Sequence, residues 1–222
     1  MVLDENRISN SKIINSREST LYIDKNIIYK IFKDNIDINQ RVEVIKMILA
    51  NKINYCPEIY DFVYKDSKIV GYAMEYYKNV AMFSQNMRFN FKAKKCTELI
   101  DIYLDLKNHY NLCYSDFHSG NICINNSSIL LLDIDSCMIK ELEIDKITDK
   151  FLCDYVLKMI YKTVFFDYEL YFSQNEREII RKNLYENING EKIQTIEDLK
   201  LFTQSVKKKD VKKVLKKIPN NI

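Results

Sequence analysis

Short apolar runs alternate with polar residues over the first third of the chain. Alternation with a period of two is typical of β-strands, and the polar pairs and triplets between the runs are typical of tight turns. The turns at Asp24–Asn26 and Asp66–Ser67 each separate two such runs, so the pattern predicts two hairpins of an antiparallel sheet. The strands predicted in this way are residues 13–14, 20–23, 27–32, 59–64 and 69–74.

Helical periodicity replaces this alternation between the hairpins and through the second half. Between the hairpins, Val42, Ile45 and Ile48 fall on one face, and Asp37 precedes them as a candidate N-cap. The expected fold class is therefore α+β, an antiparallel sheet with one helix followed by a mostly helical region. The helices predicted in this way are residues 39–51, 92–111, 149–163, 176–188 and 195–218.

One stretch, residues 112–136, combines a predicted hairpin with three spaced polar residues. Asp116 and Asn121 stand before strand 122–124, and Asp133 follows the second apolar run. In phosphoryl transfer of the protein-kinase type, one Asp orients the acceptor hydroxyl, and an Asn and a second Asp hold Mg²⁺. Asp and Asn are also common in turns, but this spacing together with the hairpin favours a catalytic site.

The same stretch resembles a known group of kinases. Tyr-Ser-Asp-Phe-His-Ser-Gly-Asn-Ile at 114–122 resembles the loop His-Gly-Asp-Leu-His-x-Gly-Asn of aminoglycoside and choline kinases, and Leu-Asp-Ile-Asp at 132–135 is similar to their Ile-Asp-Phe-Asp. The layout also resembles the lipopolysaccharide core heptose kinases. The resemblance implies a single two-lobed protein-kinase-like domain over 1–222, with an N-lobe at 1–76 and a C-lobe at 77–222. It implies ATP and Mg²⁺ as cofactors, Asp116 as catalytic residue and Asn121 and Asp133 as metal ligands, with Asp135 as a further candidate.

Two charged residues upstream match the phosphate-positioning pair of such kinases. Lys30, in Ile-Ile-Tyr-Lys, resembles the strand lysine that contacts the α- and β-phosphates, and Glu43 is the only carboxylate in helix 39–51. An outward lysine and a solvated glutamate are the simpler alternatives. Met-Glu-Tyr-Tyr at 74–77 resembles the hinge, where main-chain atoms of Glu75 and Tyr77 would bind adenine.

The sequence also departs from these kinases. The expected glycine-rich loop falls at residues 15–19, which contain no glycine. The segment from Asp133 to the next helix, expected near Thr148, is too short for a peptide-docking platform, and His118 stands where Ser/Thr protein kinases carry a lysine. These features favour a small-molecule or glycan acceptor. A minimal atypical Ser/Thr protein kinase and a pseudokinase scaffold are the alternatives.

Composition, charge and cysteine content narrow the classes of protein to which this chain could belong. The 222 residues are 47% hydrophobic and 29% charged, which is typical of one globular domain, and a net charge of +3 gives little reason to expect nucleic-acid binding. Six scattered cysteines without a Cys-x-x-Cys pair disfavour zinc and disulfides, and neither a signal peptide nor a transmembrane run is recognisable, so the expected location is cytoplasmic. The seven lysines of 207–217 predict a solvated face or a contact with an anionic partner, such as acidic lipid or nucleic acid.

Overall fold

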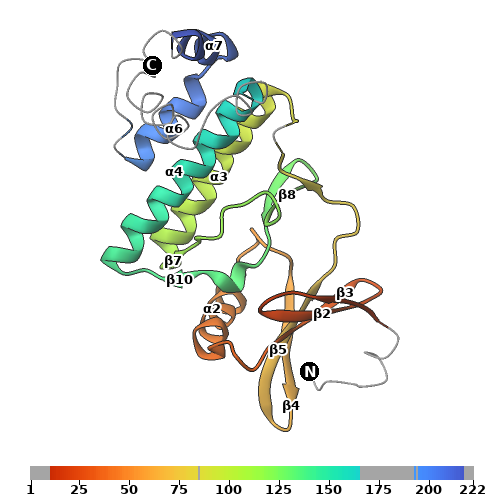
Figure 1. Ribbon diagram of the computed structural model, residues 1–222. Helices are drawn as coiled ribbons and strands as arrows, with labels where there is room; N and C mark the ends of the chain where they lie inside the picture. Colours follow the sequence, from red (N-terminus) through yellow and green to blue (C-terminus); the bar gives the residue numbers. More distant parts are fainter. Residues whose placement is uncertain (1–10, 85, 166–192, 194, 218–222) are drawn as a thin grey trace.

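The computed structural model describes residues 11–84, 86–165, 193 and 195–217 (Figure 1). It is α+β, with an antiparallel sheet formed by the N-terminal residues and helices after it. The strands are β1 (Lys12–Asn15), β2 (Ser19–Asp24), β3 (Ile27–Phe32), β4 (Ile59–Lys65), β5 (Lys68–Glu75), β6 (Ala81–Met82), β7 (Leu112–Cys113), β8 (Ile122–Asn125), β9 (Ser128–Leu131) and β10 (Met138–Ile139). The helices are α2 (Ile38–Asn51), α3 (Phe89–His109), α4 (Leu142–Phe165), α6 (Ile196–Ser205), α7 (Lys208–Lys217) and the 3-10 helix η1 (Ile134–Ser136).

The main sheet has five antiparallel strands in the order β1-β2-β3-β5-β4, and each of the strands predicted in this region is confirmed. Asp66 and Ser67 have φ angles of 49° and 61°, the left-handed conformation that a two-residue hairpin turn requires. Gly71 allows β5 to lie close to β3, because a Cβ atom there would stand 1.9 Å from the carbonyl oxygen of Lys30. Any side chain at this position would push the lysine-bearing strand away.

Helix α2 begins at the predicted cap, where the Asp37 side chain accepts a hydrogen bond from Asn39 N at 3.0 Å. Its buried residues include Val42, Ile45 and Ile48, as the periodicity predicts. The helix packs against η1, β4 and β10, and Figure 1 shows it between the main sheet and the helical part of the chain. Residues from both parts therefore meet around α2.

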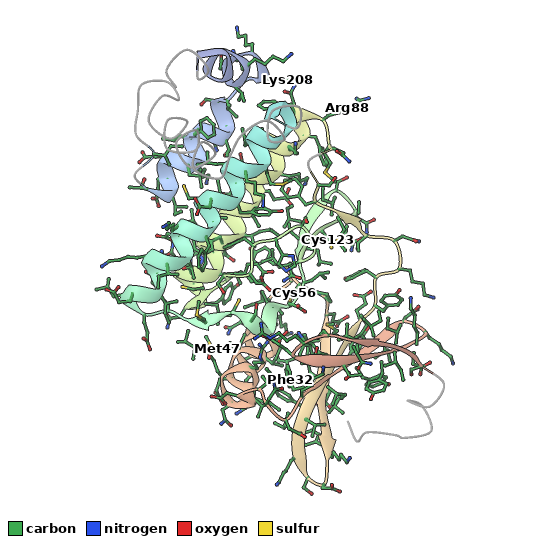
Figure 2. All side chains as sticks on the ribbon, viewed as in Figure 1. Phe32, Met47, Cys56, Arg88, Cys123 and Lys208 are labelled. Atoms are coloured by element: carbon green, nitrogen blue, oxygen red, sulfur yellow. The ribbon has the colours of Figure 1, made fainter. Side chains whose placement is uncertain are left out.

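The helical part is built on α3, which packs along α4 and α6 (Figure 1). Helical periodicity predicts a core stripe of Cys96, Leu99, Ile100, Tyr103 and Tyr110; the first four are buried, and Tyr110, the C-cap, is partly buried. Figure 2 shows side chains filling the space around α3 and α4. All six cysteines are free thiols.

Two of the predicted helices differ from the structure, and a third cannot be compared. Helix α4 begins at Leu142 rather than near Asp149, and its first turn contains Glu143 and Asp145, acidic residues that stabilise a helix N-terminus. The helix predicted over 195–218 is two helices, because the chain is extended at Val206 (φ −62°, ψ 131°). The helix predicted over 176–188 lies outside the described residues.

The lysine-rich segment forms α7, which packs against α4. The helical pattern of the sequence predicts that Val211, Val214, Leu215 and Ile218 face inward; Val211 is buried, and the side chains of the other three lie outside the described part of the chain. Across the described residues, no helix combines the length and the apolar run that spanning a bilayer requires.

Candidate active site

The loop between β7 and β8 brings the predicted catalytic residues together. The side-chain amide of Asn121 donates from Nδ2 to Oδ2 of Asp116 at 2.7 Å. The main-chain oxygen of Asn121 accepts from the amide of Leu132 at 2.7 Å. This backbone link places Asp133, the next residue, beside the loop, so the three residues predicted from their spacing are neighbours in space.

His118 is part of the same loop and faces Asp116. Its Nδ1 accepts a hydrogen bond from the main-chain amide of Gly120 at 3.0 Å, and its Nε2 lies 3.5 Å from Oδ1 of Asp116. A neutral imidazole that accepts at Nδ1 has its proton on Nε2, where it points to the carboxylate. A Cβ atom on Gly120 would come within 2.8 Å of the His118 ring, so glycine makes this packing possible.

Three aromatic side chains, those of Tyr114, Phe117 and Tyr103, pack together and support this loop. The sequence alone did not indicate this role. The hydroxyl of Tyr114 donates to the main-chain oxygen of Leu132 at 2.9 Å, which joins the start of the loop to the segment before Asp133. Burial raises the pKa of Tyr114 well above its ordinary value, so the hydroxyl keeps the proton that it donates. Phe117 contacts the rings of Tyr114 and Tyr103, with centroids 5.1 and 5.9 Å away.

Asp133 has a backbone conformation that is uncommon for residues other than glycine. Its φ and ψ angles are 51° and 38°, and its carbonyl oxygen accepts from both the amide and the hydroxyl of Ser136. Strained backbone of this kind costs free energy and is concentrated at functional sites. The carboxylate is 49% exposed, so it is accessible to a ligand.

Lys30 reaches Asp133 from β3, across 103 residues of sequence. Its Nζ donates to Asp133 at 3.0 Å and to Asp135 at 2.7 Å, and the side chain is 5% exposed. Burial acts to lower the pKa of Lys30, but the two carboxylates, Asp135 foremost, outweigh it and raise the pKa. The lysine is therefore a buried cation beside an accessible carboxylate, a combination that suits the binding of a polyphosphate with its metal ion.

Asp135 lies at the centre of the buried charges. One oxygen accepts from Lys30 and from the hydroxyl of Tyr72 at 2.6 Å, and the other accepts from Nη1 of Arg41 at 2.6 Å. Burial acts to raise the pKa of Asp135, but Lys30, Tyr72 and Arg41 together lower it below its ordinary value. The carboxylate is thus ionised and is held by residues of β3, β5 and α2.

The predicted pairing of Lys30 with Glu43 is wrong. Glu43 pairs instead with Lys46 on the surface of α2, at 2.7 Å, and its side chain is 56% exposed. Asp135 takes the place of the helix carboxylate beside Lys30, and α2 contributes Arg41 to the cluster. Its charge made Glu43 the predicted partner of Lys30, but the orientation of α2 turns Glu43 away from Lys30.

The predicted hinge, residues 74–77, begins in the last two residues of β5. The amide of Glu75 donates to the main-chain oxygen of Glu58 at 2.8 Å, so only the carbonyl group of Glu75 remains as a candidate for adenine binding. The amide of Tyr77 has no hydrogen-bond partner in the described part of the chain. The phenol of Tyr77 has a raised pKa, because it is partly buried and hydrogen-bonds to the Glu75 carboxylate.

Asn121 and Asp133, the metal ligands expected from the sequence, are too few to complete the coordination of a metal ion. Within the described residues, no three His, Cys, Asp or Glu side chains form a group that could hold a metal ion. Mg²⁺ commonly takes one or two protein oxygens and completes its coordination with phosphate oxygens and water. Asp133, exposed and beside Asn121, fits this role with a nucleotide and does not form a metal site without one.

Comparison with known proteins adds no family to this picture. The chain matches no protein-family model, and no curated protein is significantly similar to it. The function has therefore to be argued from the geometry of the site.

Proposed function

We propose that this protein is a kinase with a two-lobed protein-kinase-like fold. It uses ATP and Mg²⁺ to phosphorylate a hydroxyl group of a small molecule or a glycan. The observation that carries the proposal is the contact of Lys30 with Asp133, next to the hydrogen-bonded pair of Asp116 and Asn121. These groups are a phosphate-binding cation, a metal-binding carboxylate and an acceptor-orienting carboxylate, which are the groups that phosphoryl transfer requires.

Each residue has a distinct role in this proposal. Lys30 binds the phosphates, while Asn121 and Asp133 hold Mg²⁺, and the carbonyl of Glu75 and the amide of Tyr77 bind adenine. Mg-ATP supplies the γ-phosphoryl group, and its bond to the leaving ADP oxygen breaks as the bond to the acceptor oxygen forms. Asp116 orients the acceptor hydroxyl and takes its proton, which then passes to solvent.

His118 supports Asp116 rather than replacing it. Its Nε2 proton faces Oδ1 of Asp116, while Asn121 donates to Oδ2. The hydrogen bond from Asn121 holds the carboxylate in one orientation, with the His118 ring next to it, and the carboxylate stays accessible, since its side chain is 46% exposed. The loop therefore presents Asp116 to an acceptor that arrives from solvent.

The segment after Asp133 favours a compact acceptor over a peptide. Only residues 134–141 separate it from α4, and they form η1 and β10. This is shorter than the sequence predicts, because α4 begins at Leu142. Protein kinases bind peptides along a much longer activation segment.

A screen with ATP labelled at the γ-phosphate tests the proposal. Purified protein is incubated with Mg²⁺ and panels of amino sugars, amino alcohols, sugars, oligosaccharides and generic Ser/Thr peptides, and transfer to the protein itself is measured in parallel. We expect transfer to a member of the small-molecule or glycan panels, and none with Asp116→Ala. Efficient peptide phosphorylation that Asp116→Ala abolishes would instead identify a minimal Ser/Thr protein kinase. Mg-ATP binding without transfer to any acceptor would favour a pseudokinase.

A further inference from the structure

The buried charges continue beyond the lysine that the proposed function requires. Lys30, Asp135, Arg41 and Glu18 follow one another through ion pairs, and we call these four residues the charge chain. It links β3, η1, α2 and the turn between β1 and β2. The turn at its end, residues 16–18, stands where the glycine-rich phosphate loop was expected.

The face of α2 explains why Arg41 belongs to the charge chain and Glu43 does not. Arg41 precedes the buried residues Ile45 and Ile48 by four and seven positions, which places it on the buried face of the helix. Glu43 is two positions further on, so it is rotated by roughly 200° and faces the opposite side. A charge on the inner side of α2 can therefore come from Arg41 and not from Glu43.

Arg41 contacts two carboxylates through different nitrogens. Nη1 donates to Asp135 at 2.6 Å, and Nη2 donates to Glu18 at 2.5 Å. The guanidinium lies 5.7 Å from the ring centroid of Phe32, which Figure 2 labels between α2 and the sheet. The Arg41 side chain is 15% exposed. A planar guanidinium can bridge two carboxylates in this way, whereas the ammonium of lysine is a single point of charge.

The turn at residues 16–18 is fixed at both of its sides. Ser16 donates to the carbonyl of Ser19 from its amide and from its hydroxyl, each at 2.9 Å, and the carbonyl of Glu18 accepts from the amide of Lys33 at 3.0 Å. A glycine-rich loop adapts to phosphate because its backbone is unusually free. This turn has no glycine, so its position over a phosphate depends on contacts such as that of Glu18 with Arg41.

We propose that Asp135 and Arg41 are positioning residues of the proposed nucleotide site. Asp135 orients Lys30 in place of a helix carboxylate, and Arg41 fixes turn 16–18 beside it through Glu18. This inference rests on the proposed function, because it describes how the chain holds the phosphates of Mg-ATP. It assigns to a salt-bridged turn the task that a glycine-rich loop performs in other kinases.

Three variants test the charge chain while keeping the fold intact. Glu18→Gln removes the outer carboxylate, Arg41→Lys keeps the positive charge without the two-armed geometry, and Glu43→Gln is the matched control on the opposite face of α2. The dissociation constant of Mg-ATP is measured by calorimetry, and the melting temperature is measured without nucleotide. We expect Glu18→Gln to weaken Mg-ATP binding about threefold and Arg41→Lys about tenfold, on the scale of charge-assisted hydrogen bonds. Glu43→Gln should bind as the wild type does.

The double variant of Glu18 and Arg41 distinguishes positioning from general loss of structure. Both single changes break the same link, so the double variant should bind Mg-ATP about as weakly as Arg41→Lys alone, rather than showing the product of the two effects. Wild-type affinity in Glu18→Gln and Arg41→Lys would overturn the inference and leave the proposed function standing. A lower melting temperature of Arg41→Lys with unchanged affinity would assign the chain a purely structural role and also overturn it. A wild type that binds no Mg-ATP would remove the proposed function and the inference together.

Discussion

The two sides of the candidate site are built differently. On the side that we propose binds the nucleotide, called the nucleotide side below, Lys30 and Asp135 are 4% and 1% exposed and are enclosed by ion pairs from three elements. On the acceptor side, the side chains of Asp116 and His118 are 46% and 53% exposed and depend on a single loop. A buried charge must be fully compensated, whereas an exposed one is solvated by water and remains reachable.

Because of this difference, we expect substitutions on the two sides to affect stability and turnover differently. Changes on the nucleotide side should weaken both the fold and Mg-ATP binding, because the same ion pairs serve both. Changes on the acceptor side should lower turnover and leave the fold almost unaffected. Asp133 lies at the boundary between the two sides, since it is half exposed yet contacts Lys30.

The largest effect is expected for Asp133→Asn. Asparagine also tolerates the left-handed backbone conformation, so the fold should be retained. Loss of the charged metal ligand should reduce turnover by about three orders of magnitude, equivalent to roughly 4 kcal/mol. Turnover and the Mg²⁺ dependence of ATP binding measure this change, and a variant that turns over as the wild type would refute the assignment of Asp133.

Asp135→Asn should have the largest effect on stability. It leaves Lys30 and Arg41 buried without their shared carboxylate, and breaking a buried ion pair from one side costs about 3 kcal/mol or more. Urea unfolding monitored by circular dichroism measures this loss. Glu43→Gln, which removes an exposed carboxylate, is the control, and an equal loss in both variants would contradict the account.

The difference in stability between the wild type and Asp135→Asn should also depend on pH in a defined way. The pKa of Asp135 is lowered in the fold, so its stabilisation is present above its ordinary pKa of 3.8 and is lost as the pH falls through the lower folded value. The pKa of Lys30 is raised, so its contribution is lost only as the pH rises above 10.5. The stability difference between wild type and Asp135→Asn should therefore be constant from pH 5 to 9 and shrink below about pH 4. A difference that changes near pH 7 would contradict the assignment.

On the acceptor side, Asp116→Ala should reduce turnover by about two to three orders of magnitude, the usual contribution of a general base. The carboxylate is half exposed and its partners are in the same loop, so the melting temperature should fall by only a few degrees. Binding of Mg-ATP should remain within about twofold of the wild type, since other residues hold the nucleotide. Loss of Mg-ATP binding together with turnover would place Asp116 on the nucleotide side instead.

The smallest effect is expected at His118. Replacement by alanine removes the acceptor for the Gly120 amide and the ring whose Nε2 lies 3.5 Å from the Asp116 carboxylate. We expect about threefold to tenfold slower turnover, equivalent to roughly 1 kcal/mol, with KM for ATP unchanged. A change in KM for ATP with unchanged kcat would show that His118 acts on the nucleotide.

The sequence is most informative where contacts are local. Asp116 and Asn121 lie five residues apart in one loop, and the hairpin after them determines where Asp133 stands, so spacing was sufficient to predict the group. The strands of the main sheet were also predicted, because each hairpin turn is marked by its own polar residues. These features depend on neighbours within a few positions.

The partners of Lys30 depend on contacts across more than 100 residues. Sequence reasoning chose Glu43 by charge and overlooked Arg41, although the spacing to Ile45 and Ile48 already places Arg41 on the inner face of α2. Nothing in the sequence specifies that Asp133 and Asp135 both reach Lys30 of β3, while Asp135 alone also pairs with Arg41 of α2. That choice depends on the left-handed backbone of Asp133 and on η1 after it.

The most direct test of the central claim is a calorimetric titration of the purified protein with ATP, with and without Mg²⁺, for wild type and Lys30→Met. We expect saturable binding of ATP to the wild type that strengthens with Mg²⁺ and that ADP displaces. Lys30→Met should bind far more weakly. It should also be less stable than the wild type, but Arg41 and the Tyr72 hydroxyl still compensate the Asp135 carboxylate, so we expect the protein to remain folded. Absence of binding to the wild type, or equal binding to both proteins, would contradict the assignment of a nucleotide site to Lys30, Asp133 and Asp135.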